Sequence, residues 1–267
     1  QGHGSGQAIV AGLDWVLQNH QAYRISVLNL SIGDSENKVL AETSEFRDRV
    51  RALRNLKIAV VIAAGNSYAE NNSQQGMSSF AIVPESISVG AVYSSDSGPQ
   101  AYGESAANST GPDRITPFSQ RLHSSLAPDT RTDVFAPGAL VVSAGISDDH
   151  ASATAQGTSM AAPVVAGVVL LLQQAYACAH PGELPSVDLL EGWLRQGSMP
   201  ITDGDDEDDT VEHSQLAYGR VDALRALQIS GLPPCSGYAP AELTREPRTL
   251  PQPLTPTTFS GKIKFDE

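Results

Sequence analysis

Apolar residues follow two different spacings along this chain. Between Ala8 and His20 they recur every three or four positions, which predicts an amphipathic helix. The run ISVLNLS (25–31) is mostly apolar at successive positions, as in a strand buried on both faces, and similar runs follow at 57–65, 86–92 and 132–138. Because such strands alternate with helical segments, the pattern predicts an α/β fold: a mostly parallel sheet with helices on both faces.

The rest of the chain completes one globular unit over residues 1–230. Further helices are predicted around Phe46–Leu53 and over 159–178, 186–195 and 219–228. Two segments predict surface loops: 94–112, which is rich in Ser, Gly and Asn, and the acidic stretch 203–209. After Gly231 the chain is rich in proline, so residues 231–267 are interpreted as a linker or tail.

Charge and cysteine content narrow the possible partners. The 267 residues include 17 basic and 30 acidic ones, and a net charge of −13 argues against nucleic acid and anionic membranes. The longest apolar run, Met160–Leu172, is too short to span a bilayer. Cys178 and Cys235 fit no zinc pattern and either form one bridge or stay free. We therefore expect a monomer that binds neither nucleic acid nor membrane.

The stretch QGTSMAAPVVAG (156–167) raises the question of a nucleophile. Ser159 opens the main helix, but a serine hydroxyl is a weak nucleophile unless a base takes its proton. Taken alone, Gly-x-Ser before a helix is usually an N-cap, and AAGN (63–66) is usually a turn. However, NLSIG (29–33), AAGN, FAPG (135–138) and GTSMAAP (157–163) all meet at the carboxyl edge of the predicted sheet, where ligands bind in such folds.

In this order, the four stretches resemble the subtilisin-like serine proteases, the subtilase family, and YGRVDALRAL (218–227) resembles the end of their catalytic domain. The resemblance implies a subtilisin-like fold and serine-type endopeptidase activity. It implies that Ser159 is the nucleophile and that its own N–H and the side-chain amide of Asn66 form the oxyanion hole.

The resemblance also implies a substrate groove for a peptide or protein, which would be bound as an added strand. Its two backbone rims would be Gly4, Ser5 and Gly6 on one side and Ser31, Ile32 and Gly33 on the other. One wall of the pocket for the substrate side chain would consist of Ala63, Ala64 and Gly65.

The family's triad runs Asp, His, Ser along the chain. This chain begins at the region that GSGQ (4–7) resembles, so the resemblance implies that the Asp, the His and the first strands lie upstream and that the chain alone is inactive. His3, SDSG (95–98) and His150 imitate parts of the triad motifs. The context of His3 fits a substrate-binding segment better, that of SDSG a surface turn, and that of His150 a polar loop.

The chemistry requires no cofactor, and a secreted or extracytoplasmic location is expected. The acidic stretch 203–209 offers carboxylates for a structural calcium ion, but it lacks the ligand order of an EF-hand, and a solvated charged loop is the preferred interpretation. Two alternatives stay open: a pseudoprotease that keeps the peptide groove without a base, and an α/β-hydrolase with the order Ser159, an Asp of 203–209 and His213. Ala161 stands where the hydrolase motif has glycine, which counts against the second.

Overall fold

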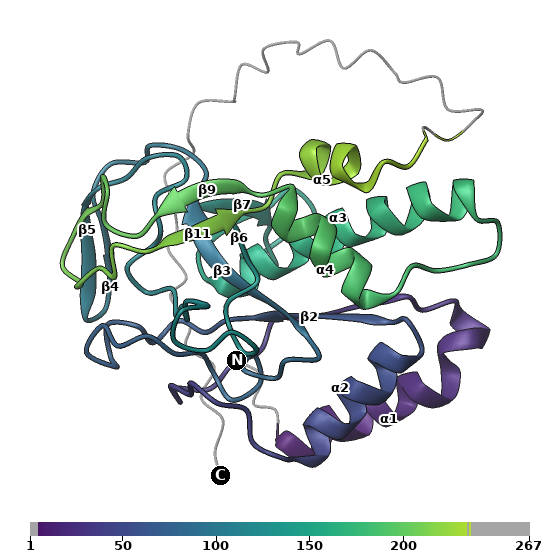
Figure 1. Cartoon of the computed structure of the whole chain (residues 1–267). Helices are drawn as coiled ribbons and strands as arrows, with labels where there is room; N and C mark the ends of the chain where they lie inside the picture. The colour runs from purple at the N-terminus through teal and green to yellow at the C-terminus, as the bar shows by residue number, and fades with distance from the viewer. Residues whose placement is uncertain (1–4, 234, 236–267) are drawn as a thin grey trace.

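A six-stranded sheet organises the structure, a computed structural model that describes residues 5–233 and 235 (Figure 1). The strands lie side by side in the order β1 (Val27–Leu30), β2 (Ala59–Ala63), β3 (Ile87–Tyr93), β6 (Val134–Ala139), β11 (Ala217–Arg220) and β9 (Met199–Thr202). All neighbours pair in parallel except β11 and β9, which are antiparallel. The predicted α/β fold with a mostly parallel sheet is confirmed.

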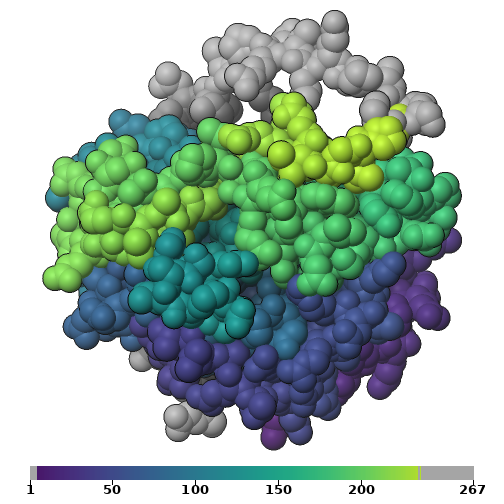
Figure 2. Space-filling view, in the orientation of Figure 1, coloured from purple at the N-terminus to yellow at the C-terminus, as the bar shows by residue number. Residues whose placement is uncertain are grey.

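Helices cover both faces of this sheet, as Figure 1 shows. On one face lie α1 (Gly6–Tyr23) and α2 (Glu45–Asn55), and on the other α3 (Thr158–Ala179), α4 (Val187–Gln196) and α5 (Ala223–Ser230). Alternate residues of β2 serve the two layers, because Val60 and Ile62 pack with α1 and α2 whereas Val61 packs with α3. In the space-filling view the early part of the chain forms one side of the molecule and the later part the other (Figure 2).

Two smaller sheets lie beside the main one. β10 (Asp208–Asp209) pairs with β5 (Ser105–Ser109), which pairs with β4 (Gln100–Tyr102). The hairpin of β7 (Val141–Ala144) and β8 (Ser152–Ala155) stands just before α3. The prediction that 94–112 is only a loop was therefore wrong. Its Ser, Ala and Asn residues have low strand propensity, so the local sequence does not predict a strand. Pairing with the distant segment 208–209 stabilises the strand instead.

The predicted helix over 219–228 was wrong at its start. Asp222 caps α5, with its carboxylate accepting the N–H of Arg225, so the helix begins only at Ala223. The preceding residues continue the sheet as β11.

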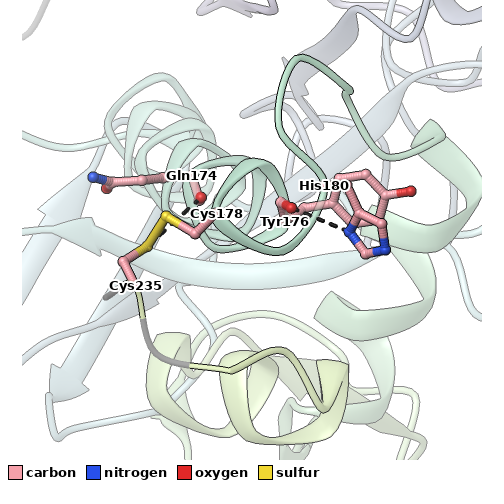
Figure 3. The surroundings of a disulfide bond; sticks show 5 residues. All are labelled: Gln174, Tyr176, Cys178, His180 and Cys235. Carbon is pink, nitrogen blue, oxygen red and sulfur yellow. Dashed lines mark hydrogen bonds between the residues drawn. A yellow bond between two sulfur atoms is a disulfide. The ribbon is translucent and has the colours of Figure 1, made fainter. Parts of the chain in front are cut away.

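Helix α3 is long and apolar enough, by length and composition, to cross a membrane. It packs against β1, β2, β3 and β6, as a core helix does, while Leu170 and Leu171 on its other face are about half exposed at 51% and 46%. Its last turn carries Cys178, which is bonded to Cys235 (Figure 3). Of the two alternatives, a disulfide or two free cysteines, the structure therefore has the disulfide. Gly4 and most of the proline-rich segment 231–267 lie outside the described residues.

Candidate active site

Ser159 is the second residue of α3, at the end of the helix that meets the segment after β1. Its main-chain carbonyl has no helical partner, because residue 163, four positions on, is a proline without an N–H. The hydroxyl of Ser31 donates to this carbonyl instead, at 2.6 Å. The Ser159 hydroxyl donates to the Ser31 carbonyl at 3.4 Å, a weak bond that leaves it free to reorient.

Asn66 follows β2 and is exposed. Its Oδ1 accepts the N–H and the hydroxyl of Thr158 at 2.8 and 2.9 Å. Because a backbone N–H can only donate, these bonds fix which end of the amide is the oxygen. Its Nδ2 has no hydrogen-bond partner among residues 5–233 and 235, and it lies beside Gly157, 3.3 Å from where a Cβ there would stand. A free amide donor thus lies next to the start of α3, the arrangement that an oxyanion donor needs.

The segments Ser31–Gly33 and Ala63–Gly65 lie next to each other. A Cβ on Gly33 would lie 3.8 Å from the Cα of Gly65 and 3.7 Å from the Ser78 side chain. Ala63 and Ala64 are fully buried, while Ile32 and Gly33 are partly exposed. Behind Gly65, the N–H of Gln120 donates to the Gly65 carbonyl at 2.9 Å and its side-chain amide donates to Glu36 and Asn37 at 2.9 Å.

The other predicted rim has a different conformation from the one expected. Ser5 caps α1 by accepting the N–H of Ala8, and Gly6 is the first residue of α1. Gly6 is therefore helical rather than part of an extended rim. No hydrogen bond joins Ser5 or Gly6 to Ser31–Gly33 in the described part of the chain.

No histidine of residues 5–233 is hydrogen-bonded to the Ser159 hydroxyl. The rings of His20, His123 and His180 each lie within hydrogen-bond distance of a main-chain carbonyl, and the His150 ring has no hydrogen-bond partner in the described chain. His3 lies outside the described residues.

His213 bonds two carboxylates, Asp203 at 2.8 Å and Asp209 at 3.1 Å, one with each ring nitrogen. This contradicts the α/β-hydrolase alternative, since neither nitrogen is left to take a proton from Ser159. The prediction that 203–209 is a solvated loop was wrong for Asp203, which is fully buried against Arg121.

Calcium within 203–209 stays a prediction, and fewer carboxylates are left for it. Asp205, Asp206 and Glu207 have oxygens within 4.8 Å of one another. However, Glu207 accepts the main-chain N–H groups of Ile115 and Gly204, and Asp206 pairs with Arg114 at 3.1 Å.

The sequence analysis did not foresee the structural roles of three residues around the site: Thr158, Gln120 and Pro163. Pro163 carried a signal, because a proline four positions after Ser159 must free its carbonyl. Nothing in the local sequence marks Gln120, which lies far from Gly65 along the chain.

Comparisons with known proteins identify the family of this chain. The model of the subtilase family, peptidase S8, matches residues 1–208. The extracellular serine proteinase of Thermus sp. (strain Rt41A) is 34% identical over 185 residues, covering 69% of this chain and 36% of that protein. The cuticle-degrading serine protease of Arthrobotrys oligospora is 34% identical over 167 residues, covering 62% of this chain and 32% of that protein. The chain thus spans about a third of the length of these relatives.

Solved structures show the same fold at low sequence identity. The prenylagaramide maturation protease PagA aligns with a TM-score of 0.56 at 18% identity, covering 83% of this chain and 67% of that one. The PatG macrocyclase in complex with peptide aligns with a TM-score of 0.55 at 17% identity, covering 83% and 56%. With the family model matching most of its length, the chain belongs to the subtilase family of serine peptidases.

Proposed function

We propose that this chain supplies the nucleophile and the oxyanion hole of a serine endopeptidase. The observation that carries the proposal is the meeting of Ser159, Ser31 and Asn66 at the start of α3, with a free Asn66 amide. Proteolysis is the chemistry of this family, and both relatives described above are named as serine proteases.

The reaction assigns a role to each group. The Ser159 oxygen attacks the carbonyl carbon of a peptide bond, and its proton passes to a histidine acting as general base. Negative charge then develops on the former carbonyl oxygen, and the Asn66 amide and the Ser159 N–H donate hydrogen bonds to it. The histidine returns the proton to the leaving amine, and water hydrolyses the acyl-enzyme.

The general base comes from outside residues 5–233 in this proposal, because no histidine there bonds Ser159. The partner is a peptide or protein held against Ser31–Gly33 by main-chain hydrogen bonds. We further propose a monomeric, extracytoplasmic protein. The Cys178–Cys235 disulfide supports an oxidising compartment, and one relative is named as extracellular.

Casein hydrolysis tests the proposal. It is measured for the 267-residue chain and for a longer form of the protein that contains this chain. We expect no turnover by the chain alone and turnover by the longer form. Ser159→Ala should abolish that turnover, and Asn66→Ala should lower it by about 10²–10³-fold, the loss known for such a donor in subtilisin. Asn19→Ala, a change on α1 that removes a side-chain hydrogen bond to the Trp15 carbonyl, is the matched control and should have no effect.

Two outcomes would contradict the proposal. Turnover by the 267-residue chain that Ser159→Ala abolishes would place the base within this chain, with His3→Ala as the next variant. A longer form that binds peptides without cleaving them would favour the pseudoprotease alternative, a peptide-binding protein that keeps the groove.

A further inference from the structure

Four charged residues from distant parts of the chain form a buried charge cluster: Arg121, Asp203, Asp209 and His213. Arg121 and Asp203 are completely buried, and the Nε and Nη2 atoms of Arg121 lie 3.0 and 2.8 Å from the two Asp203 oxygens. Ser214 also donates twice to Asp203. His213 lies between Asp203 and Asp209, whose side chain is only 2% exposed. Buried charges persist only when paired in this way.

The geometry of His213 requires its protonated form. Each ring nitrogen lies at hydrogen-bond distance from a carboxylate oxygen, and carboxylates only accept. A neutral imidazole has a single N–H and so bonds only one of them. The hydrogen bonds to Asp203 and then to Asp209 raise the pKa of His213 to about 9. At neutral pH the cluster therefore holds two cations and two anions.

The cluster touches the turn that directly follows Asn66, residues 67–73. The Arg121 guanidinium carbon lies 3.6 Å from the centroid of the Tyr68 ring, a cation–π contact. The Tyr68 hydroxyl donates to the carbonyl of Glu212 at 3.0 Å, and the N–H of Glu212 donates to the Ser73 hydroxyl at 3.1 Å. The residue before His213 is thus bonded to both ends of this turn.

We propose that Arg121 and His213 are positioning residues for Asn66 that act through Tyr68. The cluster holds residues 209–213 against the turn 67–73, and the turn sets the direction of the Asn66 amide. When His213 loses its proton, Asp203 or Asp209 loses its donor, so residues 209–213 loosen and the turn loses its bonds to Glu212. The inference rests on the proposed oxyanion role of Asn66.

The charged and titratable groups around His213 come from several elements. Asp203, which follows β9, and Asp209 of β10 are hydrogen-bonded to the His213 ring, and Glu212 precedes His213 in the chain. Arg121, Tyr68 and Tyr218 of β11 lie near Asp203. Burial raises the pKa of Asp203, but the bonds from His213 and Ser214 and the charge of Arg121 outweigh it and lower the pKa below its usual range. Burial raises the pKa values of Tyr68 and Tyr218 above their usual range.

The test follows the carbon-13 signal of the Asn66 side-chain carbonyl, assigned with Asn66→Ala, in the full chain between about pH 6 and about pH 10. We expect this signal to titrate together with the His213 ring, with a midpoint at about 9. Asp209→Asn removes one carboxylate partner and should lower both midpoints by about 1 pH unit. Asp206→Asn, a carboxylate in the same loop that pairs with Arg114, should leave them unchanged.

Tyr68→Phe separates positioning from mere stabilisation, because it keeps the ring over Arg121 and removes the hydroxyl that bonds Glu212. The His213 titration should persist in this variant while the response of Asn66 falls by half or more. The inference would be overturned if the Asn66 signal did not change as His213 titrates, or if it changed as much in Tyr68→Phe as in the wild-type protein. The titration uses no substrate. A negative titration result would therefore not contradict the protease proposal, and an absence of peptidase activity would not change the titration result.

Discussion

Gly65, Gly157 and Pro163 shape the surroundings of Ser159 through the backbone rather than through side chains. Gly157 and Gly65 have φ values of 147° and 118°, which L side chains rarely adopt. Pro163 removes one helical hydrogen bond and so makes the Ser159 carbonyl available to Ser31. The position of Ser159, the proposed nucleophile, therefore depends on residues that have no proposed role in the chemistry.

Gly65→Ala should destabilise the protein by about 2–4 kcal/mol, because strain at positive φ is added to a steric clash. The new Cβ would overlap Oε1 of the buried Gln120. Urea unfolding measures the loss. Gly98→Ala is the matched control: it also has a positive φ, 70°, but open space around it, so it should cost only about 1 kcal/mol. Equal losses in the two variants would show that Gln120 imposes no constraint on Gly65.

Three secondary-structure elements, β1, β2 and α3, bring the residues of the proposed site to one edge of the sheet. β1 leads to Ser31, β2 leads to Asn66, and α3 begins at Thr158 beside both. Only the last turn of α3, at the opposite end from Ser159, is covalently tied to another segment in the described chain, through Cys178 (Figure 3). This bond joins α3 to residues beyond α5 and spans 57 positions of sequence.

Replacing both cysteines, Cys178→Ser with Cys235→Ser, should lower the free energy of unfolding by about 2–4 kcal/mol, because the unfolded chain regains the freedom of the closed loop. Urea unfolding with and without a reducing agent measures this. The wild-type protein should lose the same amount on reduction, and the double variant should not respond to the reducing agent. An unchanged unfolding midpoint in the double variant would mean that the bridge contributes nothing to stability.

For the whole molecule, the net charge of −13 contrasts with the balanced charges of its interior. His213 makes the stability of the protein depend on pH. The hydrogen bonds to Asp203 and then to Asp209 raise its pKa in the folded state to about 9, above the ordinary value of about 6.5. A group whose pKa is raised on folding stabilises the folded protein fully at pH values below its unfolded-state pKa. This stabilisation is lost as the pH rises through its folded-state pKa.

We therefore expect thermal stability to fall between about pH 6.5 and about pH 9, with a loss on the order of 3 kcal/mol. The melting temperature as a function of pH measures the loss. His213→Gln should be less stable at pH 6.5 and should lack this slope, whereas His150→Gln, whose ring has no hydrogen-bond partner in the described residues, should retain it. A wild-type melting temperature that does not change over this interval would contradict the protonated state of His213.

The sequence by itself determined the elements that follow from local periodicity, namely the buried strands β2, β3 and β6 and the helices α1–α4. It also predicted the strand β1, but the prediction that this strand is buried on both faces was wrong, because β1 lies at the edge of the sheet with Asn29 exposed. The sequence also placed Asn66 and Ser159 at one edge of the sheet, because parallel strands end together and the motif order left few arrangements. Those inferences needed only the spacing of apolar residues and the positions of small polar ones.

Only the tertiary structure decided the features that join distant segments: the β4–β5–β10 sheet, the Cys178–Cys235 bond, the Ser31–Ser159 contacts and the burial of Asp203. An acidic run such as 203–209 has the composition of a solvated loop, and no local pattern shows that Arg121 and His213 neutralise two of its carboxylates. Partners more than 80 residues apart, such as Arg121 and Asp203, are brought together by the folding of the whole chain, so their pairing leaves no periodic trace in the sequence.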